Sequence, residues 1–292
     1  MKGDCGMSRI AIVTDSNSGI TQKEAENMGV FVVPMPFMIN EQEYFEDISL
    51  TQTEFYERLS QNAEVATSQP SIEGITKVWD KVLESYDSLL YIPMSSGLSG
   101  TCGTAAMLAE DYNGRVRVVD NQRISVTQRN SVVDALEMAQ AGKSLEEIYT
   151  ALMDTKLEAS IYIMVDTLKY LKKGGRLTPA VAALGTLLRI KPVLQIQGER
   201  LDTFAKARTV KQGTSIMLNA IQEDMEKRFH NDVENMYINV AHTQNQEGAE
   251  ALKEQLLQIY PGKDILINPL SLSVSCHIGP GALAIAIAKK AG

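Results

Sequence analysis

Cysteine and histidine are scarce in this chain of 292 residues, which contains three of each. None of them stands at a spacing typical of metal-binding motifs, such as two cysteines separated by two residues. A structural zinc site is therefore not expected, and no metal or other cofactor is predicted. Three scattered cysteines also predict reduced thiols rather than a disulfide framework.

Basic runs and long apolar stretches are missing too. Lys and Arg number 28 against 36 Asp and Glu, a net charge of −8, which disfavours binding to nucleic acid or to anionic lipid. The best apolar stretch, residues 281–288, is far shorter than the roughly 18 residues of a transmembrane helix. Residues 1–7 contain no apolar signal segment, and Met7 is an alternative start. We expect a cytoplasmic protein without stable membrane insertion.

Several catalytic signatures are absent as well. The sequence has neither the lysine-containing glycine loop of nucleotide-binding P-loops nor the glycine fingerprint of dinucleotide-binding folds. It also lacks the G-x-S-x-G turn that carries the nucleophile of many hydrolases. Kinase and dehydrogenase activity therefore have no support in the sequence.

What the sequence does contain is an alternation of strand and helix patterns. Up to about residue 155, apolar strands alternate with helices that open on Ser/Thr-x-x-Glu capping boxes at Thr21, Thr51 and Ser144. This alternation is typical of a mostly parallel sheet with flanking helices. The strands are expected at 9–14, 30–35, 88–93 and 116–120.

After residue 155 the pattern changes. A glycine-centred hairpin over 192–204 is mixed with crossover connections, which indicates a mixed sheet. The predicted fold is α/β with two domains, 7–155 and 156–292. The elements expected in the second domain are strands 159–165, 192–197, 201–204, 236–241 and 265–268, helices 209–229 and 246–258, and a last helix after residue 281.

Hydroxyl side chains and glycines gather in three segments that follow strands, 15–19, 67–71 and 95–101. Strand-to-helix loops of a parallel sheet meet at its carboxyl edge, where α/β folds bind ligands. Free amides at a helix start, together with hydroxyl groups, suit a phosphate or a carboxylate. Each serine or threonine could equally be a simple helix cap.

His277 is the leading histidine of the candidate site, because it stands in a turn constrained by two glycines and a proline, on a segment expected to be extended. His242 fits a core position as well as a site, and His230 fits the surface. Asp15, Asp120 and Asp166 each close a strand and could be N-caps, general bases or magnesium ligands. Cys276 beside His277 is not expected to form a catalytic pair.

Five motifs spread over residues 8–290 resemble the bacterial DegV family of fatty-acid-binding proteins, which present lipid to a fatty acid kinase. The motifs are Ile12-Val-Thr-Asp-Ser16, Thr67-Ser-Gln-Pro-Ser71, Ser95-Ser-Gly-Leu-Ser-Gly-Thr101, Tyr170-Leu-Lys-Lys-Gly-Gly-Arg-Leu177 and His277-Ile-Gly-Pro-Gly281.

The resemblance implies a two-domain α/β protein that holds a long-chain fatty acid, such as palmitate or oleate, in a tunnel between its domains. Its carboxylate would be held by Thr67, Ser99 and His277. Further binding residues implied are Ser68, Ser96 and Gly97. A separate ATP-binding fatty acid kinase subunit would be the partner, and the chain itself would be a carrier rather than an enzyme.

Three points stay open at this stage. Arg176 could contact a partner, close the cleft or be a solvated turn residue. Gly103, in the first turn of a helix, departs from the pattern and could let the chain or a ligand pass closely. Two other functions also fit: a hydrolase or transferase that uses Ser99 or Ser96 with His277, and a module whose apolar cleft binds a peptide.

Overall fold

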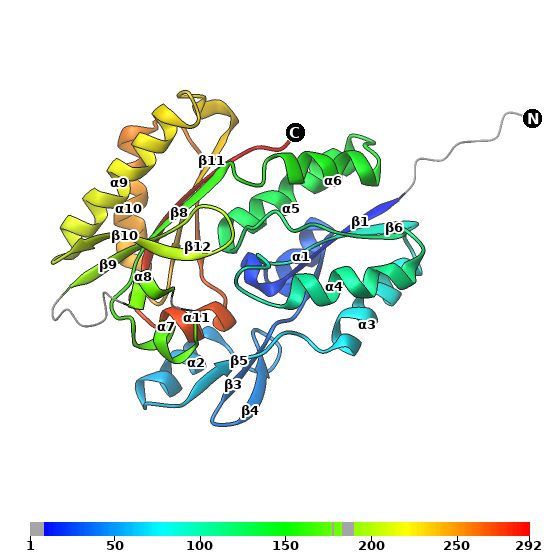
Figure 1. Ribbon diagram of the computed structural model, residues 1–292, viewed down its shortest axis with the longest axis horizontal. Helices are drawn as coiled ribbons and strands as arrows, with labels where there is room; N and C mark the ends of the chain where they lie inside the picture. Colours follow the sequence, from blue (N-terminus) through cyan, green and yellow to red (C-terminus); the bar gives the residue numbers. More distant parts are fainter. Residues whose placement is uncertain (1–8, 177, 183–189) are drawn as a thin grey trace, which may run out of the picture.

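The computed structural model describes residues 9–176, 178–182 and 190–292, which form three β-sheets with helices packed around them (Figure 1). The first sheet is parallel and has the strand order β2-β1-β6-β7. Its strands are β1 (Ile10–Asp15), β2 (Phe31–Val33), β6 (Ser88–Ile92) and β7 (Val116–Val118).

Helices cover both faces of this parallel sheet, as the alternation of strand and helix patterns predicts. The helices are α1 (Gln22–Met28), α3 (Ile72–Leu83), α4 (Thr101–Ala109), α5 (Ser125–Gln140) and α6 (Leu145–Asp154). Side chains of β1 alternate between the faces, so that Ile12 packs in the cluster formed with α5 and α6, and Val13 in the cluster formed with α3 and α4. Trp79 of α3 is completely buried in the second cluster.

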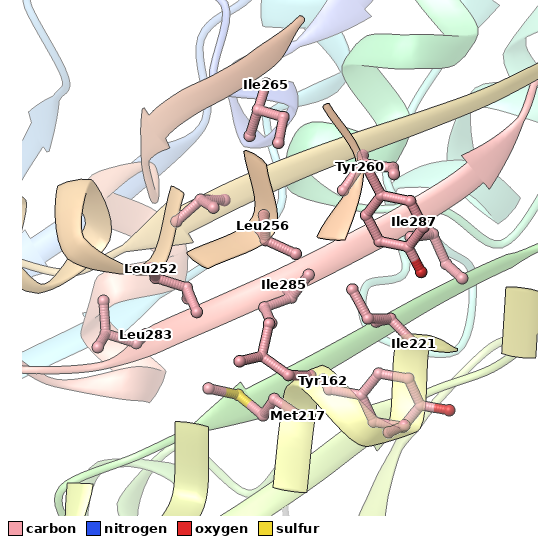
Figure 2. Packing of buried hydrophobic residues seen from close by; sticks show 14 of the residues in the cluster. Tyr162, Met217, Ile221, Leu252, Leu256, Tyr260, Ile265, Leu283, Ile285 and Ile287 are labelled. Atoms are coloured by element: carbon pink, nitrogen blue, oxygen red, sulfur yellow. The ribbon is translucent and has the colours of Figure 1, made fainter. Parts of the chain in front are cut away.

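The second sheet has six strands in the order β10-β9-β8-β13-β11-β12. Its β11 and β12 run parallel and the other neighbours antiparallel, which confirms the predicted mixed sheet. Helices α9 (Val210–Lys227) and α10 (Gln246–Ile259) cover one face (Figures 1 and 2). The strands are β8 (Ala159–Met164), β9 (Lys191–Ile196), β10 (Leu201–Ala207), β11 (Met236–His242), β12 (Ile265–Pro269) and β13 (Leu283–Lys289).

The third sheet, which the sequence patterns do not predict, is small and antiparallel with the order β4-β3-β5. Its strands are only three or four residues long, too short to show a clear period: β3 (Pro36–Ile39), β4 (Gln42–Phe45) and β5 (Val65–Thr67). Helix α11 (Leu272–Ile278) packs on it and shares a core with Phe37 and Phe55. The remaining elements are α2 (Gln52–Ser60), α7 (Lys169–Lys173), α8 (Pro179–Ala182) and the 3₁₀ turns 16–18, 110–112 and 233–235.

The segment after residue 281 is a strand, β13, and the predicted last helix is wrong. Its sequence alternates Ala with Leu or Ile, which is the two-residue period of a strand. Leu283 and Ile285 point toward α9 and α10 (Figure 2). Ala284 and Ala286 point to the opposite face, where the small side chain of Ala284 lines a cavity.

Two of the three predicted capping boxes are confirmed, at Thr51 and Ser144. Thr21 caps the amide of Glu24 at 3.1 Å, but the Glu24 carboxylate pairs with Arg129 of α5 instead of returning to the cap.

Helix α5 also contacts strands of the first and second sheets. The division into domains near residue 155 stays a prediction. None of the helices in the described ranges is long and apolar enough to cross a bilayer.

Candidate functional site

A cavity of about 280 Å³ lies against the face of the second sheet that α9 and α10 leave free. One side of the cavity is lined by strands of the second sheet, β8, β9, β10, β11 and β13. The rest is lined by the end of β5, by the starts of α4 and α5, and by α7 and α11. The cavity therefore collects side chains from strands of the second and third sheets and from segments that follow strands of the first sheet.

Most of the cavity wall is apolar. The small side chain of Ala284 and the branched side chains of Ile161 and Ile163 come from adjacent strands of the second sheet. Met35 and Met94 line the cavity from the first-sheet side, where their flexible thioethers adapt to ligand shape. The apolar wall consists of Met35, Met94, Leu98, Ile124, Val126, Ile161, Ile163, Leu171, Ile196, Leu201, Ala241, Leu270, Val274, Ile278 and Ala284.

One end of the cavity is polar and carries most of the predicted binding residues. Thr67, at the end of β5, lies with its Oγ1 2.8 Å from Nε2 of His277 on α11. Ser99 lies just before α4, and its Oγ is 2.9 Å from Oγ1 of Thr101. Ser68 lines the same end. The structure thus brings together four of the six residues predicted to bind the ligand.

His277 is held as a neutral imidazole. Burial, with a smaller contribution from the charge of Arg176, lowers its pKa to about 4. Nδ1 is buried without a partner among the described residues. We assign the proton to Nε2, because an Nδ1–H here would be a buried donor with no acceptor. Nε2–H then donates to Thr67 Oγ1, which leaves the Thr67 hydroxyl free to donate into the cavity.

Gly174 makes room for this imidazole. A Cβ atom at residue 174 would overlap Nδ1 and Cε1 of His277. The neighbouring Gly175 has a φ of +68°, which favours glycine for a separate, conformational reason. The two glycines of the Lys172-Lys-Gly-Gly-Arg176 turn therefore serve different purposes, a close approach and a left-handed backbone.

Lowering the pH from 7 to 5 is expected to destabilise the folded protein through His277. Its pKa falls from 6.5 in the unfolded chain to about 4 on folding, so stability present above pH 6.5 is lost as the pH falls toward 4. The expected loss at pH 5 is about 1–2 kcal/mol. Urea denaturation at both pH values should show a loss larger by this amount in wild type than in His277→Gln, and equal losses would contradict the neutral imidazole.

Arg176 is exposed and bridges two segments at the polar end. Its guanidinium donates to the carbonyl of Gly174 at 2.7 Å and to that of Leu98 at 3.5 Å, so it connects the glycine turn with the Ser99 loop. Arg176 also lines the cavity. Of the alternatives for this residue, the geometry favours the cleft contact. The last motif residue, Leu177, lies outside the described residues.

The structure does not bring Ser96 and Gly97 to this cavity. Ser96 turns away and donates to Asp120 through its hydroxyl at 2.7 Å and its amide at 3.2 Å. Gly97 packs on the turn between β9 and β10, where a Cβ atom would overlap the carbonyl oxygen of Glu199. A residue that packs against distant backbone shows no local signal of it in the sequence.

The other residues singled out in the sequence have environments that point to structural roles. Burial raises the pKa of the Cys276 thiol to about 12, which makes it a poor nucleophile. His242 is buried and accepts from the amide of Asn245 at 3.1 Å. Asp166 pairs with Lys191. The space around Gly103 is open, with nothing within 4 Å of a Cβ atom there, so the close approach considered for Gly103 is not found.

Four polar residues of the cavity were not predicted as site residues: Asn17, Gln69, Ser125 and Ser273. Asn17 stands in the hydroxyl-rich segment 15–19, and Gln69 stands in the segment 67–71. Because Gln69 follows Thr67 by two positions in the sequence, its place there could have suggested it. Ser125 and Ser273 stand in helices without any local motif. Their role depends on which helix faces the cavity, and only the tertiary structure shows it.

A serine nucleophile activated by histidine is not supported by these distances. Ser99 Oγ contacts Thr101, whereas His277 Nε2 contacts Thr67. In the part of the chain that the structure describes, no carboxylate contacts Nδ1 of His277. The pairing of nucleophile, base and orienting acid that defines such sites is therefore not formed by these residues.

Comparison with known proteins places the chain in a family. Residues 9–290 match the family described as "Uncharacterised protein, DegV family". A DegV domain-containing protein of Clostridium perfringens, CPE0026, is 32% identical over 288 residues, which cover 96% of this chain and 97% of the relative.

Two solved structures have the same fold. One, described as "Fatty Acid Binding of a DegV family Protein from Thermus thermophilus", has a TM-score of 0.88 at 32% identity and covers 96% of this chain and 99% of that one. The other, described as "DegV, a fatty acid binding protein from Bacillus subtilis", has a TM-score of 0.85 at 31% identity and covers 97% and 100%. The chain is therefore a member of the DegV family.

Proposed function

We propose that this protein binds a long-chain fatty acid, such as palmitate or oleate, in the cavity. The observation that carries the proposal is the polar end formed by Thr67, Ser99 and His277, which opens onto an otherwise largely apolar wall. An acyl chain matches the wall, since each buried methylene contributes about 0.8 kcal/mol. The fatty-acid-binding descriptions of the Thermus and Bacillus proteins support the same ligand.

The carboxylate would lie at the polar end. The Thr67 hydroxyl, freed by the donation from His277, and the Ser99 hydroxyl would donate to its oxygens. Helix α4 starts at Thr101 without a side-chain cap, so its amide dipoles would also favour an anion beside Ser99. The guanidinium of Arg176 would add charge attraction at the rim.

The exposed position of this end favours presentation of the ligand to a partner. Ser68, Gly100 and Arg176 all line the cavity and are exposed at the surface. A bound carboxylate would therefore lie close to solvent while the acyl chain is enclosed. We propose that an ATP-binding fatty acid kinase subunit phosphorylates the carboxylate there, and that this chain carries the substrate without transferring phosphate itself.

Native mass spectrometry of the purified protein tests the binding proposal. We expect a co-purifying species with the mass of a fatty acid, and saturable binding of palmitate or oleate by the delipidated protein. Protein that is repeatedly free of lipid and binds neither acid would refute it, and capture of a peptide by such protein would favour a peptide-binding cleft.

Esterase and phosphatase screens of wild type and Ser99→Ala separate the carrier from a hydrolase: turnover that Ser99→Ala abolishes would favour the enzyme.

A further inference from the structure

A second polar patch interrupts the apolar wall of the cavity. It consists of Asn17 in the 3₁₀ turn after β1, Ser273 on α11, whose hydroxyl donates to Asn17, and Ser125 at the start of α5, the helix that packs against that turn. Ser273 and His277 are four residues apart on α11, so about one helical turn, roughly 6 Å, separates the patch from the polar end. The patch is therefore a feature of the wall along which the acyl chain would lie.

The hydroxyl of Ser125 has no hydrogen-bond partner among the described residues, although Ser125 is only 6% exposed. Ser125 also has a φ of +55°, a backbone conformation that glycine would adopt with less strain. The chain thus carries a hydroxyl where the backbone alone would favour glycine. A buried hydroxyl that faces a cavity without a partner gains a hydrogen bond when a ligand supplies one.

The Asn17 side-chain amide is also incompletely satisfied. Its Oδ1 accepts from the hydroxyls of Ser271 at 3.0 Å and Ser273 at 2.5 Å. Its Nδ2 donates to the sulfur of Met94, 2.7 Å away, and a thioether is a weak acceptor. Met94 lines the cavity too. The Asn17 side chain also hydrogen-bonds to the Asp15 carboxylate, so one of its two amide N–H groups is left with only the weak thioether acceptor.

Asp15 holds the patch together and sets its charge preference. Its carboxylate accepts from the amides of Asn17 and Met94, each at 2.9 Å, and from the Gln128 side chain on α5 at 3.1 Å. The turn, the strand end and α5 are thereby fixed around one buried acid. A negative charge behind the patch disfavours a second carboxylate and leaves a neutral oxygen as the suitable guest.

We propose that Asn17, Ser125 and Ser273 form a subsite for a hydroxyl group on the acyl chain, so that the protein takes hydroxylated long-chain fatty acids. This inference rests on the proposed fatty acid function. A ligand hydroxyl both donates and accepts, so it can accept from the Asn17 amide and exchange a hydrogen bond with Ser125. An unsubstituted chain leaves the Ser125 hydroxyl without a partner and one Asn17 N–H on a thioether alone.

Titration of the delipidated protein with stearate and with 5-, 6- and 12-hydroxystearate tests the subsite, because a patch roughly 6 Å from the polar end faces the first few carbons after the carboxylate. We expect wild type to bind at least one hydroxystearate several-fold more tightly than stearate. In Ser125→Ala the ratio of the two affinities should fall about three- to ten-fold, the loss of one neutral hydrogen bond. Ser215→Ala, which removes an exposed serine of α9 outside the cavity lining, should keep the wild-type ratio.

The outcomes separate the subsite from the function on which it rests. Wild type that binds every hydroxystearate no more tightly than stearate would refute the subsite and leave fatty acid binding intact. Wild type that binds none of the four acids would refute both. If Ser125→Ala does not fold, Ser125→Gly provides the test, because glycine adopts the +55° φ freely. A variant that keeps the hydroxystearate preference would overturn the assignment of Ser125.

Discussion

Replacing Thr67 with valine is expected to weaken fatty acid binding by about ten- to a hundred-fold, the typical range for losing a hydrogen bond to a charged group. Valine keeps the shape of threonine and its preference for a strand, and Thr67 ends β5. The substitution removes the hydroxyl proposed to donate to the carboxylate and leaves Nε2 of His277 without its 2.8 Å partner. Titration of delipidated wild type and Thr67→Val with palmitate measures the change.

The matched control is Thr203→Val. Thr203 also lies in a strand, β10, but does not line the cavity. Its replacement should leave palmitate affinity within about two-fold of wild type, as expected for a residue without a role in binding. Equal affinities of Thr67→Val and wild type, with both proteins folded, would show that Thr67 does not hold the carboxylate.

Replacing Gly174 with alanine is expected to displace His277 and to lower the free energy of unfolding by about 1–3 kcal/mol, the usual cost of overpacking. The φ of Gly174 is −78°, which alanine adopts without strain. The effect should therefore come from the overlap of the new Cβ atom with the imidazole. Because the overlap forces the ring out of its position against Thr67, palmitate affinity should fall at least about ten-fold.

A double-mutant cycle shows whether the imidazole is the cause. In a His277→Ala background the overlap is gone, so Gly174→Ala should cost much less stability than in wild type. Gly103→Ala is the control, because a Cβ atom there meets nothing within 4 Å and alanine suits a helix better by about 1 kcal/mol. Strictly additive effects of Gly174→Ala and His277→Ala on stability would refute the proposed contact.

Much of the fold could be predicted because its signals are local. Strand β1 is a continuous buried run of mostly apolar residues, and helix α9 has a clear helical period over eighteen residues. The hairpin of β9 and β10 has a glycine with a φ of +95° in its turn. By contrast, the short strands of the third sheet have too few residues for a period to be visible, and the alanines of β13 favour a helix although the segment forms a strand.

The candidate site was predictable only in part, for the same reason. Thr67, Ser99 and His277 lie in motifs that the sequence displays, so they could be named before their distances were known. Ser125 and Ser273 carry no such motif, and Ser96 has the right chemistry but turns to Asp120. Whether a hydroxyl faces a cavity or a neighbouring carboxylate depends on packing between distant segments.

By itself, the sequence determined the α/β class, the parallel and mixed sheets, the family motifs and a candidate set of hydroxyl and histidine side chains. Those properties follow from residue type and short-range periodicity. Only the tertiary structure decided that Thr67 meets His277, 210 positions away, that Gly174 must be small beside that imidazole, and that Ala284 of β13 lines a cavity. Each of these depends on contacts between segments far apart in the chain, which local residue patterns do not encode.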